Sequence, residues 1–403
     1  MNKNNKFWIC TEYFSPDISS ATGYFLTEIA YYLKKKVDIR VITATSKSFI
    51  TNPNYYKKED ECIKIIRLKG GNINKKIFFK RSIKFLYLSI QYFFILLIYC
   101  KKNDKILVVT NPAPLVIIGA LIKTFKKIEY TILAHDVFPE NMIALGLINK
   151  NSIVYKILAK SFNWGYSKSD KIICIGNDMR NVFEKKITTY QGQLHVIYNW
   201  SDIDNLSFAE KEKNIIIQNN KLQDKLVVTY AGNIGRAQGI QELLDCILSV
   251  SINKNVHFLF FGKGALENEV RQKTKEAKNI TFLGSLSRND KNIFLTAADI
   301  SIVTLSKNMV GLGVPSKTYD IMGSGRPILF IGDLNSDIAK LIEKYDIGWN
   351  CEPTDFIRFN EIIDIALKNT NLILKKGEKA REIAQSIFAK EIILKKYEEI
   401  LLC

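Results

Sequence analysis

Short apolar runs alternate with longer amphipathic stretches along this chain, and the alternation predicts its fold. In the first half, the runs are nearly continuous in Val, Ile and Leu, as in parallel sheets that helices cover on both faces. They predict strands at 7–11, 37–43, 62–68, 105–109, 130–134, 171–175 and 194–198, with helices near 22–35, 78–100, 114–126, 151–166 and 177–186. The first half is therefore predicted to be a doubly wound α/β domain.

A polar, repetitive stretch at 201–224 interrupts this pattern, which then restarts. Strands, each followed by a helix, are predicted at 225–230, 256–260, 280–283, 300–304 and 327–331. We expect one Rossmann-like domain at 1–200 and a second at 201–390, with a last helix at 391–403 crossing back to the first. Ligands of such sheets bind beyond the carboxyl ends of the strands, so the expected active site is the cleft between the two domains.

The net charge of +18 is concentrated in the first half. Residues 1–200 hold 31 basic and 14 acidic side chains, whereas residues 201–403 hold 27 and 26. An apolar fraction of 47% excludes a disordered chain. The first domain is therefore expected to meet an anionic partner.

A basic and aromatic segment at 75–102 explains much of this charge. Its apolar part, 85–100, rises only about 24 Å as a helix, too short to cross a bilayer core of about 30 Å. We expect an interfacial helix on an anionic membrane surface, although a helix buried in the first domain would have the same composition. A nucleic acid partner is rejected, because the basic residues interleave with long aliphatic ones. The expected membrane contacts are Lys80, Arg81, Lys84, Phe85, Tyr92, Phe93 and Phe94.

Cysteine and histidine usage predicts neither disulfides nor a metal site. The seven cysteines are scattered without a CxxC pair, and the three histidines form no ligand spacing. No long apolar run resembling a signal peptide follows Met1, so a cytoplasmic protein is expected. The Asp202-Ile203-Asp204 triplet is interpreted as solvated linker rather than as a metal ligand.

Three glycine-bearing turns follow predicted strands of the second domain, at 231–239, 261–264 and 311–320. Glycine lets backbone N–H groups approach a phosphate closely. Each turn also carries a cation, namely Arg236, Lys263 and Lys317. Together they predict a site for a nucleotide diphosphate, and the absence of a GxxxxGK[ST] pattern excludes a P-loop.

The run from Val314 to Leu329, Val-Pro-Ser-Lys-Thr-Tyr-Asp-Ile-Met-Gly-Ser-Gly-Arg-Pro-Ile-Leu, resembles the donor-binding signature of glycosyltransferase family 4. The resemblance covers nearly the whole chain, with further landmarks at 13–17 with Gly23, 134–140, 170–178, 196–202 and 297–301. It is strongest to the fucosamine transferase-like branch of O-antigen and capsule assembly.

This resemblance implies a GT-B fold of two facing Rossmann-like domains and a retaining sugar transfer that needs no metal or cofactor. His135 would lie beside the transferred sugar, while Arg236 and Lys317 would stabilise negative charge on the leaving phosphate. The implied catalytic residues are His135, Asp136, Arg236 and Lys317. The implied donor-binding residues are Gly23, Gly232, Asn233, Gly235, Gln238, Gly262, Lys263, Gly264, Pro315, Ser316, Thr318, Tyr319 and Asp320.

The chain departs from the family pattern around the donor. Asp320 stands at the second glutamate of the E-x7-E pair, which contacts the ribose, but Leu312 stands at the first. Asn233 and Gln238 replace the Arg and Lys of the first glycine turn.

The sequence therefore indicates a cytoplasmic glycosyltransferase that is peripheral on the inner face of the plasma membrane. It is expected to build the repeat unit of an O-antigen, as in lipopolysaccharide, or of a capsule. The expected reaction moves L-FucNAc from UDP-L-FucNAc to GlcNAc linked to polyprenyl (undecaprenyl) pyrophosphate. Two alternatives remain at this point: a UDP-sugar 2-epimerase of the same fold and a noncatalytic GT-B scaffold.

Overall fold

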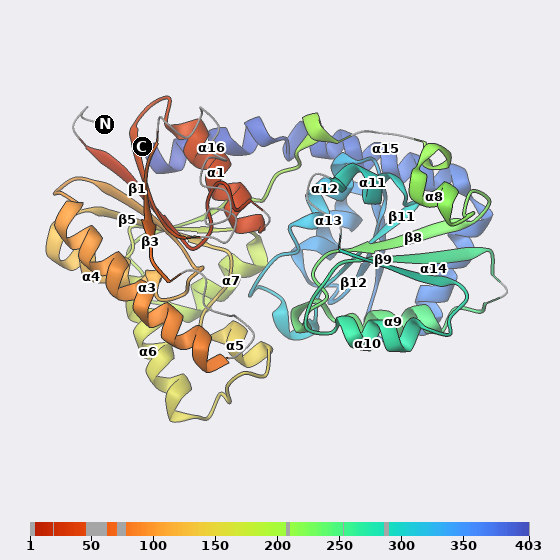
Figure 1. Cartoon of the computed structure of the whole chain (residues 1–403), viewed down its shortest axis with the longest axis horizontal. Helices are drawn as coiled ribbons and strands as arrows, with labels where there is room; N and C mark the ends of the chain where they lie inside the picture. Colours follow the sequence, from red (N-terminus) through yellow and green to blue (C-terminus); the bar gives the residue numbers. More distant parts are fainter. Residues whose placement is uncertain are drawn as a thin grey trace. The chain divides into compact units, whose positions relative to one another are not determined.

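The computed structural model describes residues 5–18, 20–45, 63–70, 78–206, 210–252, 254–285 and 290–402, the side chains of 78–82 excepted. The chain forms two compact units (Figure 1). The first comprises Met1–Ile197, Gly311–Gly313 and Leu394–Cys403, and the second comprises Tyr198–Val310 and Val314–Ile393.

The first unit contains a seven-stranded parallel sheet in the order β3-β2-β1-β4-β5-β6-β7. The strands are β1 (Lys6–Thr11), β2 (Asp38–Ala44), β3 (Lys64–Leu68), β4 (Lys105–Val109), β5 (Glu129–Ala134), β6 (Lys171–Cys174) and β7 (Gln193–Val196). The helices are α1 (Ala21–Leu33), α3 (Phe78–Tyr99), α4 (Leu115–Lys126), α5 (Glu140–Ala144), α6 (Ile153–Ser167) and α7 (Asn177–Lys186). The strand order reverses between β1 and β4, and a parallel sheet binds ligands beyond the strand ends at such a switch point.

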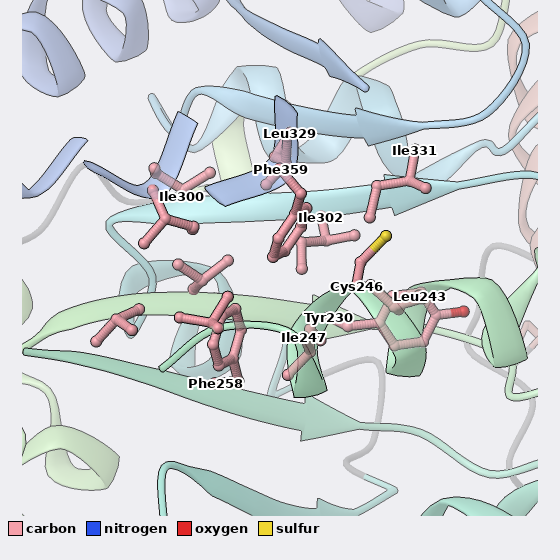
Figure 2. Close-up of a cluster of buried hydrophobic side chains, with 14 of the residues drawn as sticks. Tyr230, Leu243, Cys246, Ile247, Phe258, Ile300, Ile302, Leu329, Ile331 and Phe359 are labelled. Carbon is pink, nitrogen blue, oxygen red and sulfur yellow. The ribbon is translucent and has the colours of Figure 1, made fainter. Parts of the chain in front are cut away.

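The second unit contains a six-stranded parallel sheet in the order β10-β9-β8-β11-β12-β13. The strands are β8 (Leu226–Ala231), β9 (Val256–Phe261), β10 (Ile280–Gly284), β11 (Ile300–Thr304), β12 (Ile328–Ile331) and β13 (Gly348–Cys351). The helices are α8 (Ile215–Asn219), α9 (Ile240–Leu248), α10 (Glu267–Thr274), α11 (Lys291–Thr296), α12 (Lys317–Gly323), α13 (Asp337–Tyr345), α14 (Phe356–Lys368) and α15 (Thr370–Ile387). Figure 2 shows its core, where Phe258 and Ile302 of the sheet meet Ile247 of α9 and Phe359 of α14.

The predicted fold class is confirmed, since two parallel sheets with covering helices are present. The predicted strands match observed ones to within about two residues, and Cys62, the predicted start of β3, lies outside the described residues. Strand β13 was not predicted. It has only four residues, and the polar Asn350 interrupts its apolar run.

The last helix, α16 (Lys390–Leu402), ends in the first unit. Lys105 Nζ donates to the carbonyl of Leu401 at 3.0 Å, and Lys171 Nζ donates to that of Ile400 at 2.8 Å. Both lysines also pair with Glu129 at 2.9 Å. The last carbonyls of α16, which have no partner within the helix, are thus satisfied by cations at the amino ends of β4 and β6.

Two of the expected membrane contacts, Lys84 and Tyr92, are wrong, because they lie on the face of α3 that packs against the first unit. Lys84 is 1% exposed and pairs with Glu12 at 2.6 Å, and Tyr92 is 0% exposed and donates its hydroxyl to the carbonyl of Thr11 at 2.6 Å. Phe85 and Phe93 are half-buried and Phe94 is exposed, whereas the side chains of Lys80 and Arg81 lie outside the described residues. Both buried residues contact the end of β1, at the switch point of the sheet.

The outer face of α3 is apolar and exposed, with a spacing of three to four residues. It consists of Ile83, Leu86, Tyr87, Ile90, Phe94 and Ile98. Even so, within the described ranges no helix combines the length and the apolar character that crossing a bilayer requires.

The buried Lys84–Glu12 pair yields a prediction for stability. We expect Lys84→Met to lower the free energy of unfolding by about 3–5 kcal/mol, because it removes the lysine that pairs with the buried carboxylate of Glu12. Urea titration measures this, with Lys101→Met at an exposed lysine as the control. The double variant Glu12→Gln/Lys84→Met should recover part of the loss; equal stability of Lys84→Met and the wild type would contradict the prediction.

Candidate functional site

The first two glycine turns of the second unit meet backbone to backbone at the carboxyl ends of β8 and β9. Gly232 N donates to Phe261 O at 2.9 Å, and Ile234 N donates to Lys263 O at 3.0 Å. A Cβ on Gly262 would lie 1.9 Å from the carbonyl oxygen of Gly232, and the φ of Gly262 is +151°. Glycine is therefore required here sterically, and the two turns form one rigid edge.

Lys317, the first residue of α12, reaches the same edge. Its Nζ lies 3.6 Å from the ring centroid of Tyr230 and 3.3 Å from where a Cβ on Gly232 would be. The residue is half-buried, but its Nζ is shielded from solvent and has no hydrogen-bond partner among the described residues. Desolvation by burial lowers the pKa of Lys317 to about 7. An unpaired ammonium group in this position is stabilised when an anion binds beside the turns.

Tyr230 supports both parts of this edge, and the sequence analysis did not identify it. Its hydroxyl donates to the carbonyl of Asn233 at 2.7 Å, while its ring lies against Lys317. Tyr230 is 1% exposed. The position of Tyr230 directly before a glycine turn could have indicated its role, since the hydroxyl of a buried tyrosine needs a hydrogen-bond acceptor. The contact of its ring with Lys317 could not be predicted, because the two residues are far apart in the sequence.

The other polar residues of the turns are exposed. Arg236 lies in a 3-10 helix, Arg236–Gln238, and is exposed, as is Lys263. Asn233 Nδ2 lies 3.3 Å from Gln238 Oε1, so these two replacements of the family's cations contact each other. Gly235 is buried in the same turn, and Gly264 lies too close to Ile234 for a side chain. The edge thus combines one shielded cation with two exposed ones.

The side chains of Thr318 and Tyr319 support α12 instead of facing solvent. Thr318 is 0% exposed and donates its hydroxyl to the carbonyl of Pro315 at 2.8 Å. Tyr319 is 1% exposed, and its ring packs against Phe388 with centroids 5.1 Å apart. Only the main-chain groups of these two residues, with Ser316 at the start of the helix, are therefore available to a ligand.

Asp320 belongs to a charged cluster that the sequence analysis did not predict. Lys291 Nζ lies 3.1 Å from Asp320 Oδ2 and 3.8 Å from Asp202 Oδ2. Asp202 N donates to Asp320 Oδ1 at 3.3 Å. The interpretation of Asp202 as solvated linker is therefore wrong, since the residue is 9% exposed, whereas Asp204 is exposed. Leu312, in place of the first glutamate, is 8% exposed.

In the first unit, His135 directly follows β5. Its Nδ1 lies 3.1 Å from Thr22 Oγ1 of α1. The main-chain N–H groups of His135 and Asp136 both donate to Thr110 Oγ1 at 3.0 Å, so the residue after β4 holds the loop after β5. Sequence reasoning missed Thr22 and Thr110, which become neighbours of His135 only through the strand order.

The imidazole of His135 is held neutral. Desolvation by burial lowers the pKa of His135 to about 4. Its Nε2 is shielded from solvent and has no partner in the part of the chain that the structure describes. Gly23 lies nearby in α1, where a Cβ would be 2.2 Å from the carbonyl of Asp17. A neutral imidazole with one fixed and one free nitrogen can exchange a hydrogen bond with a bound hydroxyl group.

The described residues contain no group of three His, Cys, Asp or Glu side chains that could hold a metal ion. The five cysteines with described side chains are free and buried. Burial raises the pKa of Cys174, for example, to about 12, so its thiol is unreactive.

Comparison with known proteins identifies the class of this architecture. Residues 211–385 match the family model described as "Glycosyl transferases group 1". The chain is 29% identical over 398 residues to "Probable glycosyltransferase WbjE" of Pseudomonas aeruginosa, covering 97% of this chain and 96% of the relative. It is 21% identical over 402 residues to "Putative colanic acid biosynthesis glycosyl transferase WcaI" of Escherichia coli K12, covering 95% and 96%.

Among solved structures, the chain resembles Anabaena Alr3699/HepE in complex with UDP-glucose. The TM-score is 0.70 at 15% identity, covering 98% of this chain and 99% of that one. Together with the two parallel sheets, this similarity establishes the GT-B fold.

Nearly all of the stretch that matches the glycosyl transferase group 1 model lies in the second unit, and it includes the first two glycine turns and Lys317. The chain is a glycosyltransferase. The matches confirm the enzyme class expected from the sequence, and they do not favour an epimerase or a noncatalytic scaffold.

The lowered pKa of His135 predicts a pH dependence of stability. In the unfolded chain, the imidazole has an ordinary pKa near 6.5 and binds a proton below that pH. In the folded protein, it stays neutral until the pH falls to about 4. The free energy of unfolding should therefore fall as the pH drops from about 6.5 towards 4, by up to about 3 kcal/mol from this group.

Urea titrations at pH 7 and pH 5 measure this effect. His135→Gln should lose less stability than the wild type over the same interval. His257→Gln is the comparison variant, because burial also lowers the pKa of His257 to about 4. Identical pH dependence in the wild type and His135→Gln would show that His135 is not held neutral.

Proposed function

We propose that this glycosyltransferase transfers a sugar from a UDP-linked donor to a lipid-linked acceptor during assembly of a bacterial surface polysaccharide. The observation that carries the proposal is Lys317, whose shielded ammonium group lies beside two interlocked glycine turns and has no hydrogen-bond partner in the described part of the chain. The similarity to a colanic acid biosynthesis glycosyl transferase and to a UDP-glucose complex supports the substrate classes.

The donor diphosphate would bind at the carboxyl edge of β8 and β9. Lys317 would neutralise part of its charge without first having to break an ion pair. Arg236 and Lys263 add exposed cations at the same edge. Such preorganised charge stabilises the leaving diphosphate as the glycosidic bond to the sugar breaks. Asp320, oriented by Lys291, is the proposed ribose contact.

The chemistry we propose is a retaining transfer without a protein nucleophile or metal. The departing phosphate oxygen accepts the proton of the acceptor hydroxyl, and Lys317 and Arg236 stabilise the developing negative charge. Neutral His135 contributes a hydrogen bond from or to the sugar through Nε2, with Thr22 holding the ring. Asp136 lies next to it on the same loop.

The proposed donor is UDP-L-FucNAc, and the proposed acceptor is GlcNAc linked to polyprenyl pyrophosphate. The resemblance of the segment from Val314 to Leu329 to the fucosamine transferase-like branch supports this choice. A colanic acid glycosyl transferase among the relatives supports a role in surface polysaccharide assembly, such as an O-antigen or capsule.

A lipid-linked acceptor places the enzyme at the cytoplasmic face of the membrane. We propose that the outer face of α3 makes this contact, through Leu86, Ile90 and Phe94, in place of the buried Lys84 and Tyr92. Lys101 and Lys102, exposed at the end of the helix, would meet anionic lipid headgroups.

A transfer assay tests the reaction. Wild-type protein with UDP-L-FucNAc, prenyl-pyrophosphate GlcNAc and EDTA should yield a product heavier by one acetamido-deoxyhexose, detected by mass spectrometry. Lys317→Met should reduce the rate by at least about 100-fold, because a charge-stabilising donor is lost. Lys307→Met, at an exposed lysine of the same unit, should keep the wild-type rate. Absence of transfer from any UDP-sugar by a folded protein would refute the proposal.

The pKa of Lys317 predicts how UDP affinity varies with pH. The bound diphosphate favours the protonated amine, which the free protein loses above about pH 7. The dissociation constant for UDP should therefore rise towards about tenfold per pH unit above pH 7. Calorimetry measures the constant, and Lys317→Met should give weaker affinity with a flat profile from pH 7 to 9. A flat wild-type profile would contradict the assignment.

A further inference from the structure

The start of α6 exposes aliphatic side chains that none of the described elements of the first unit covers. Ile153 is 76% exposed, Val154 57% and Ile157 61%, and Leu147 in the preceding loop is 42% exposed. Ile153, Val154 and Ile157 lie on neighbouring positions of the first two turns of α6 and form one apolar ridge. Large aliphatic residues exposed as a group indicate a contact surface.

The opposite face of α6 is firmly packed, so the ridge projects from a fixed helix. Phe162 stacks on Phe138 with ring centroids 5.7 Å apart, and Tyr155 lies 3.5 Å from Glu140 through its hydroxyl. A Cβ on Gly165 would lie 2.9 Å from Val116 in the first turn of α4.

The ridge extends past the carboxyl edge of the sheet. The contact of Gly165 with Val116 places that part of α6 at the beginning of α4, which follows β4. Ile153 lies twelve residues earlier in the helix, about 18 Å further along its axis. Figure 1 shows the start of α6 projecting away from the sheet. The ridge is thus on the side of the unit where His135 follows β5.

The charged residues of the segment that carries the ridge are all positive. Between Glu140 and Asp170 the chain contains no acidic residue. Lys150, Lys156 and Lys160 are exposed beside the aliphatic residues. Aliphatic side chains interleaved with lysines fit the interface of an anionic bilayer, where the apolar groups enter the acyl boundary and the ammonium groups meet lipid phosphates.

We propose that the start of α6 inserts into an anionic lipid surface and forms a second membrane contact, in addition to the one proposed for α3. The role of this contact rests on the proposed function: it would bring a lipid-linked sugar to the edge of the sheet that holds His135. The contact itself is argued from the exposed residues of α6 alone. The ridge carries lysines on the helix itself, which suits an anionic lipid surface.

Vesicle co-sedimentation of the full chain tests the proposal. The probes are vesicles of phosphatidylcholine alone and vesicles with about a third of phosphatidylglycerol. Ile153→Asp/Ile157→Asp should weaken binding to the anionic vesicles at least tenfold. The control is Ile357→Asp, because Ile357 on α14 of the second unit is also 76% exposed. It should bind like the wild type.

A charge variant tests the second half of the surface. Lys156→Gln/Lys160→Gln should weaken binding to anionic vesicles at least threefold and reduce its dependence on salt, with no effect on the neutral vesicles. Circular dichroism and thermal unfolding establish that each variant is folded.

The outcomes separate this proposal from the proposed function. Transfer to a GlcNAc-pyrophosphate acceptor with a short alkyl chain should be unchanged in Ile153→Asp/Ile157→Asp, because that acceptor needs no bilayer. If the wild type performs no transfer but binds vesicles through the ridge, only the proposed function fails. Vesicle binding at the wild-type level by the aspartate variant overturns the α6 proposal. If the wild type proves to be a dimer that the aspartate substitutions dissociate while vesicle binding is unchanged, the ridge is a contact between copies of the chain, and the proposal is likewise overturned.

Discussion

The close approach of two backbone turns is the constraint on which the candidate donor site depends. Gly262 can follow β9 only because it lacks a Cβ, which would otherwise overlap the carbonyl of Gly232 after β8. This contact brings the two turns into one edge, and Tyr230 supports that edge by donating its hydroxyl to the carbonyl of Asn233. The side chain of Lys317 packs against the ring of Tyr230 and lies beside the turn. Positive charge is thereby held ready where a diphosphate would bind.

In the first unit, polar side chains hold the loops at the carboxyl edge of the sheet. Its strand order reverses between β1 and β4, and the residues that follow these strands need partners at the open edge. Thr110 satisfies two main-chain groups of the loop that carries His135. Glu12, after β1, is neutralised by Lys84 from α3. The result is a rigid edge with a neutral imidazole, in contrast to the cationic edge of the second unit.

The two faces of helix α3 have different surroundings. One face of α3 supplies Lys84 and Tyr92 to the switch point, and the other exposes Leu86, Ile90 and Phe94. Of the two alternatives that composition left open, the buried helix describes the inner face of α3, and the membrane helix stays a proposal for its exposed outer face. Each describes one face of a helix with apolar residues around most of its circumference.

Much about this protein was determined by the sequence itself. Apolar runs and their spacing defined nearly all strands and the two parallel sheets, because a strand buried on both faces must be apolar throughout. The run around Lys317 indicated the glycosyltransferase class. Tertiary structure alone decided that Tyr230 supports Lys317, that Asp202 is buried with Lys291, and that Lys84 faces inward. Periodicity shows which residues share a helix face, but which face is covered depends on elements far away in the chain.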